Sequence, residues 1–61
     1  MKRKDLERHL RAHGCAFVRN GAGHDIWRNA AGTRQAAVPR HNEVANGTAR
    51  AICRQLDIPK P

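Results

Sequence analysis

The sequence predicts a small α+β domain in which a helix, three antiparallel strands and a second helix follow one another. Apolar residues recur at helical spacing near both ends of the chain, and three short runs of strand-forming residues, separated by turn-forming residues, lie between them. A three-stranded antiparallel sheet needs cover on only one face, and two short helices on that face are enough. A chain of 61 residues forms a single domain, here residues 1–61.

The first helix is expected from about Lys4 to His13. Leu6 and Leu10 are four residues apart, with charged residues between them, which places both on one face of a helix. Gly14 follows in the position of a C-terminal stop. The segment is therefore a short amphipathic helix.

Three strands are expected after this helix. They cover residues 15–19, Asp25–Asn29 and Arg34–Pro39, and Asn20-Gly21 is a typical hairpin turn between the first two. Proline has no N–H to donate, so Pro39 belongs at the end or edge of its strand.

The second strand poses a problem of alternation. His24 and Ile26 share one face of it, whereas Trp27 lies on the other. Either Ile26 or Trp27 is therefore exposed, unless a bulge near Gly23 resets the alternation for His24. We expect Trp27 in the core, together with Phe17, the only other aromatic residue.

A loop over residues 41–46 leads to the second helix. Asn46-Gly47-Thr48 offers capping side chains, and Pro59 ends the helix. Spacings of three and four place one set of apolar residues on a single face: Ala49, Ile52, Cys53 and Leu56.

The chain is strongly basic. Twelve Lys and Arg residues against five Asp and Glu give a net charge of +7, and nine of the twelve cations are arginine. Arginine suits structured contacts to phosphate or carboxylate, so the expected partners are nucleic acid, an acidic protein, or both in turn. A basic surface that only keeps the protein soluble is the alternative.

The two cysteines do not form a disulfide framework. Cys15 and Cys53 are far apart in the sequence, and no CxxC pair or other closely spaced ligand pair occurs. We expect both to serve as small packing residues. No apolar run approaches the length of a signal-peptide core or a membrane span, so we expect a soluble, cytoplasmic protein without contact to membranes.

A glycine-rich turn, Gly21-Ala22-Gly23, delivers His24 to the start of the second strand. Histidine titrates near neutrality and can both take and give a proton. RNA carries its own nucleophile, the ribose 2′-hydroxyl. His24 is therefore a candidate general base toward that hydroxyl, or a general acid toward the leaving 5′-oxygen, with no metal or cofactor required.

Basic residues in the strands and turns around His24 are candidate phosphate contacts, which would anchor RNA without identifying its sequence. They are Arg19, Arg28, Arg34, Arg40 and His41. His41 is also the natural second proton-transfer candidate. The pair Arg50 and Arg54, one turn apart on the last helix, suits either RNA phosphate or an acidic partner.

A metal site is not expected. His9 and His13 have the i, i+4 spacing of two ligands on one helix face, but no third ligand is evident nearby.

An ordered set of short segments runs through nearly the whole chain. It comprises the first helix ending in Gly14, Arg19 before the glycine turn, His24-Asp25-Ile26-Trp27-Arg28, Val38-Pro39-Arg40-His41-Asn42-Glu43, and Thr48 through Ile58. With these residues in this order, the chain resembles the HicA-type toxins of bacterial toxin–antitoxin pairs.

The resemblance implies a fold like that of double-stranded-RNA-binding domains and ribosome-independent mRNA cleavage by a single histidine, whose position His24 occupies. It also implies a type II system in which a HicB-type antitoxin neutralises the toxin, a monomer alone and a hetero-oligomer with its antitoxin. Two positions depart from the family pattern: Gly23 stands where Ser or Asn is frequent, and Asp57 stands where Gly is usual.

Two other functions fit the same residues. One is a non-catalytic double-stranded-RNA-binding module, in which His24 only contacts a 2′-hydroxyl. The other is an interaction protein whose basic surface exists for an acidic partner.

Overall fold

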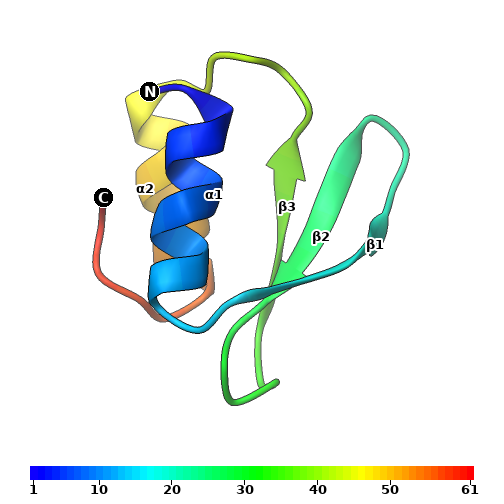
Figure 1. Ribbon diagram of the computed structural model, residues 1–61, viewed down its shortest axis with the longest axis vertical. Coiled ribbons are helices and arrows are strands. Elements are labelled where there is room, and N and C mark those ends of the chain that lie inside the picture. Colours follow the sequence, from blue (N-terminus) through cyan, green and yellow to red (C-terminus); the bar gives the residue numbers. More distant parts are fainter.

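The computed structural model describes residues 1–61 and confirms the predicted order of elements. The elements are α1 (Arg3–Ala12), β1 (Ala16–Asn20), β2 (His24–Arg28), β3 (Gln35–Pro39) and α2 (Asn46–Gln55). The strands form one antiparallel sheet in the order β1-β2-β3, and both helices lie on the same side of it (Figure 1). Neither helix is long and apolar enough to cross a membrane.

The hydrophobic core is a single cluster between the two helices and the sheet. Trp27 is its largest fully buried side chain, with 1% of its surface exposed, as expected from the sequence. The other ten members are Leu6, Leu10, Cys15, Ala36, Val38, Val44, Ala49, Ile52, Cys53 and Leu56. Eleven buried residues make a small core, so the fold has little stability in reserve.

The end of α1 is closed by two backbone hydrogen bonds of the Schellman type. Gly14 N–H donates to the Arg11 carbonyl oxygen over 3.0 Å, and Cys15 N–H donates to that of Leu10 over 2.9 Å. Cys15 is buried directly beyond this turn. The helix stop predicted at Gly14 is confirmed.

The same motif closes α2, with an aspartate in the position that glycine normally takes. Asp57 N–H donates to the Arg54 carbonyl oxygen over 3.1 Å, and Ile58 N–H donates to that of Cys53 over 3.0 Å. Asp57 has a φ of 59° and is the single non-glycine residue with positive φ. The departure from the family pattern therefore puts a side chain where the backbone is left-handed.

The predicted cap of α2 is wrong. The helix begins at Asn46 itself, and its N-cap is Ala45, which offers no side-chain hydrogen bond. Residues 46–48 therefore lie inside the first turn and do not precede it. The Asn46 side chain instead accepts a hydrogen bond over 3.2 Å from the ammonium group of Met1, which ties the two helix starts together.

The bulge lies in β1, not near Gly23. Pairing of β2 with β3 is regular throughout, whereas pairing of β1 with β2 shifts between Phe17 and Arg19. Phe17 lies opposite Trp27, but Arg19 lies opposite Ile26, so Val18 is the extra residue.

The bulge decides which face Arg19 occupies. Residues directly opposite each other share a face of a sheet. Without the extra residue, Arg19 would lie opposite Asp25, on the face toward the helices. With it, Arg19 shares a face with Ile26 and, two residues along β2, with His24. We call this uncovered side of the sheet the open face.

Phe17 does not belong to the core, contrary to the prediction from the sequence. Phe17 is 49% exposed, and Val18 is 39% exposed. The Phe17 and Trp27 rings are nearly perpendicular, with their centroids 6.2 Å apart. The helices do not extend over β1, because α2 packs against β3 and β1 is the strand at the opposite edge of the sheet (Figure 1).

Cys15 and Cys53 are both free and buried, as expected for packing residues. Burial raises the pKa of both thiols above the ordinary thiol value, and for Cys53 the neighbouring Cys15 adds to the effect. Both groups therefore stay protonated in the folded protein at pH values where exposed thiols ionise.

The buried thiols should make stability fall with pH in the alkaline range. A raised pKa means that the unfolded chain loses these protons first, from about pH 8.5 upward. Their stabilising contribution is thus complete below that pH and decreases above it. Urea unfolding as a function of pH should show this decrease, and it should flatten in Cys15→Ala/Cys53→Ala. An equally steep decrease in the double variant would contradict the assignment.

Asp57→Gly should stabilise the protein. Glycine adopts positive φ without the steric cost that aspartate carries, and we expect a gain of about 0.5–1 kcal/mol after the entropy of the more flexible unfolded chain is subtracted. For so small a domain this raises Tm by a few degrees, on the order of 2–8 °C. Asp57→Ala is the matched control, because it removes the carboxylate but keeps the strain, and it should give no gain.

Candidate functional site

His24 begins β2 at the end of the sheet where the β1–β2 turn and the end of β3 meet. It lies opposite Pro39 and is partly exposed on the open face. Its backbone carbonyl oxygen accepts a hydrogen bond from Gly21 N–H over 2.7 Å, which closes the turn. No group of the protein forms a hydrogen bond with its ring. Neither ring nitrogen is therefore engaged by another group of the protein.

The turn brings the His24 ring directly against Gly21. A Cβ atom at Gly21 would lie 3.3 Å from both Cδ2 and Nε2 of His24, and 3.1 Å from its carbonyl oxygen. Any side chain there would press on the ring. Gly23 meets a different demand, because its φ of 76° is left-handed while the space around it is open. After glycine, asparagine is among the residues that adopt this conformation most readily.

Arg40 holds this turn in place from the end of β3. Its Nη2 donates a hydrogen bond to the Gly21 carbonyl oxygen, and its Nη1 lies 3.6 Å from Oδ1 of Asp25. The Asp25 side chain is only 16% exposed, and its Oδ1 is buried without a hydrogen bond. Arg40 thus neutralises a largely buried carboxylate and also stabilises, through its hydrogen bond to Gly21, the turn that carries His24.

The predicted phosphate contacts fall into two groups. Arg19 shares the open face with His24, while Arg40 and the exposed His41 follow Pro39 at the same end of the sheet. The two others, Arg28 and Arg34, are exposed at the opposite end, where Arg28 pairs with the residue after Arg34. Four residues of strand, about 13 Å at roughly 3.3 Å per residue, separate the α-carbons of His24 and Arg28.

A comparison with protein families identifies the family of the chain. The model of the HicA toxin of bacterial toxin–antitoxin systems matches residues 3–58, nearly the whole chain. The chain belongs to the HicA toxin family. It is therefore the toxin of a toxin–antitoxin pair, and an antitoxin is its expected partner. Searches of the curated proteins and of the solved structures gave no match.

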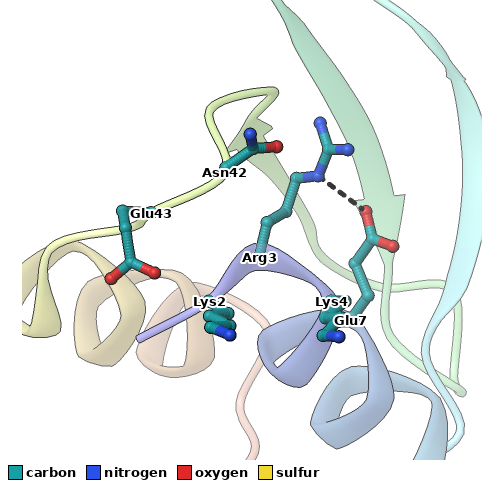
Figure 2. Close-up of a pocket in the computed structure, with 6 residues that line it drawn as sticks. All are labelled: Lys2, Arg3, Lys4, Glu7, Asn42 and Glu43. Atoms are coloured by element: carbon teal, nitrogen blue, oxygen red, sulfur yellow. Dashed lines mark ion pairs between the residues drawn. The ribbon is translucent and has the colours of Figure 1, made fainter.

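A hollow of about 380 Å³ at the start of α1 extends the basic surface of this HicA toxin. Figure 2 shows its lining, which contains no hydrophobic residue: Lys2, Arg3, Lys4, Glu7, Asn42 and Glu43. Arg3 pairs with Glu7 over 3.8 Å, and the Met1 ammonium lies 3.9 Å from Glu43. Lys2 and Lys4 have no acidic partner.

The hollow was not predicted from the sequence. Its lining continues the loop that carries Arg40 and His41, since Asn42 comes next along the chain. Three cations within the first four residues were the available signal. In the fold these cations lie beside that loop, because Arg3 N–H donates a hydrogen bond to the Asn42 carbonyl oxygen over 2.9 Å.

The toxin has no group of three or more His, Cys, Asp or Glu residues that could hold a metal ion. The His9 and His13 rings lie with their centroids 4.6 Å apart and their planes tilted by 59°, and His9 Nε2 lies 2.7 Å from the Pro59 carbonyl oxygen. The contact between His9 and Pro59 holds the chain beyond α2 against α1. Arg50 and Arg54 lie elsewhere, in a hollow of about 320 Å³ lined also by Asp57, Ile58 and Lys60.

Arg40→Met should destabilise the toxin by leaving the Asp25 carboxylate without its charge partner. We expect a loss of about 1–3 kcal/mol in the free energy of unfolding, measured by urea denaturation. Adding Asp25→Asn should restore part of that loss, because the amide needs no counter-charge. If the double variant is as unstable as the sum of the two single variants, the two residues are not coupled.

Proposed function

We propose that this toxin is a ribosome-independent mRNA endonuclease in which His24 transfers a proton during cleavage. The observation that carries the proposal is the state of the His24 ring. It lies against Gly21 on the open face, has no hydrogen bond to the protein, and shares its face with Arg19. A histidine whose ring is held by packing, with free nitrogens and a cation nearby, is suited to act on a bound phosphodiester.

The cleavage chemistry follows from the structure of RNA. The 2′-oxygen attacks the neighbouring phosphorus, its proton leaves, and the bond from phosphorus to the 5′-oxygen breaks to give a 2′,3′-cyclic phosphate and a 5′-hydroxyl. His24 serves as the base that takes the 2′-hydroxyl proton or as the acid that protonates the 5′-oxygen. Attack by RNA's own hydroxyl needs no covalent enzyme intermediate, so a shallow surface site is sufficient.

The cations would position the RNA backbone around His24. Arg19 shares the open face with His24, His41 follows β3 at the same end of the sheet, and Lys2 and Lys4 extend the positive surface past the loop. Such contacts hold phosphates without identifying bases. Arg40, with part of its guanidinium engaged by Gly21 and Asp25, contributes charge and above all holds the turn.

The neutralising partner we propose is an acidic antitoxin of the HicB type. A domain with a net charge of +7 attracts acidic surfaces over a distance, and a partner that binds only the folded state also stabilises a small core. The toxin would be monomeric alone and form a hetero-oligomer with the antitoxin.

His24→Gln should abolish cleavage and leave RNA binding intact. Proton transfer by one side chain typically contributes a factor of about 10²–10⁴ in rate, so loss on that scale is expected in a gel assay of a synthetic transcript. His13→Gln is the matched control, because His13 is exposed at the far end of α1. It should cut at the wild-type rate.

A transcript with 2′-O-methyl groups tests the nucleophile separately. It should bind the wild-type toxin and remain intact, because the attacking hydroxyl is blocked. Binding of unmodified RNA without any cleavage by the wild type would instead identify a non-catalytic RNA-binding module. Wild-type rates in His24→Gln would exclude His24 from the chemistry.

A further inference from the structure

The outer edge of β1 has no partner within the toxin. β1 pairs with β2 on one side only, and no backbone hydrogen bond outside the sheet involves residues 16–20. All five residues of the strand are exposed. The other edge of the sheet differs, since β3 buries Ala36 and Val38, ends in Pro39 and packs against α2. Unpaired N–H and C=O groups on an exposed edge are a template for another strand.

The exposed apolar side chains of the toxin gather on this edge. Phe17 and Val18 are its two exposed large hydrophobic residues, and they are neighbours in β1. Single exposed apolar residues are common, but two adjacent ones on an unpaired strand in a protein this small indicate a binding surface.

The charges around the pair determine what can bind there. Arg19 follows Val18 directly, Arg28 lies opposite Ala16 at the other end of the strand, and β1 contains no acidic residue. A second copy of the toxin would bring these arginines and two net charges of +7 together, which opposes association. The edge therefore suits a partner segment with apolar and acidic side chains.

We propose that the outer edge of β1 is the docking site for the antitoxin. An extended, acidic segment of that protein pairs with β1 as a fourth strand, places an apolar side chain on Phe17 and Val18, and sets a carboxylate beside Arg19. The inference rests on the antitoxin partner proposed above and is independent of RNA cleavage. Such a partner would also inhibit the proposed site, because it occupies Arg19, a proposed phosphate contact on the same open face as His24.

The experiment measures the affinity of the purified cognate antitoxin by calorimetry, with His24→Gln as the inactive background. Phe17→Ser/Val18→Thr should weaken binding about tenfold or more, as expected when central apolar contacts are removed. Circular dichroism and thermal unfolding verify that the variant is folded. Arg19→Glu provides a second, surface variant that should weaken binding strongly. Arg8→Glu is its matched control, because it makes the same change in charge at an exposed position of α1, and it should have a much smaller effect.

An RNA-cleavage assay in the presence of antitoxin complements the affinity measurement. With His24 intact, Phe17→Ser/Val18→Thr should cut RNA at the wild-type rate and do so in the presence of antitoxin amounts that silence the wild type. Unchanged antitoxin affinity in both edge variants would overturn the proposal, as would absence of binding by the parent protein. A self-associated toxin that Phe17→Ser/Val18→Thr dissociates would also overturn it, by identifying a second copy as the occupant. None of these outcomes depends on whether His24 is catalytic.

Discussion

The two ten-residue helices of this toxin cover one side of its sheet only in part, and the rest of the structure follows from that limit. Trp27, Ala36 and Val38 supply the sheet's share of an eleven-residue core, and the helices meet them from one side. The other side remains open, so basic side chains and a histidine can stand there without a desolvation cost. β1, beyond the reach of the helices, leaves Phe17 and Val18 exposed.

An ion pair on the helix side of the sheet supports the turn that carries His24. Asp25 points toward the helix side, where its Oδ1 is buried, and a carboxylate there requires a cation. Arg40 supplies that cation from the end of β3 and also bonds the carbonyl oxygen of Gly21. Because the His24 ring rests on Gly21, the geometry of the proposed chemistry depends on an ion pair on the opposite face of the strand.

In the proposals made above, different parts of the surface bind RNA and antitoxin, and Arg19 lies between them. The bulge at Val18 is the physical reason, since it turns Arg19 onto the open face while Phe17 keeps its contact with Trp27. A partner on the edge of β1 can thus compete for a phosphate contact without covering the histidine. The positive charge that would hold RNA is the same charge that draws an acidic partner to this edge.

The sequence by itself determined the order of helices and strands, the helix stop at Gly14, the burial of Trp27 and the His24 turn as the candidate site. These features depend on local spacing, on glycine and on apolar periodicity, which are visible within a few residues. Only the tertiary structure decided the rest. The bulge at Val18, the exposure of Phe17, the start of α2 at Asn46 and the position of Arg34 at the end of the sheet away from His24 arise from how strands pair and how far helices reach. Those are relations between segments distant in the chain, and so is the Arg40–Asp25 pair beneath the histidine.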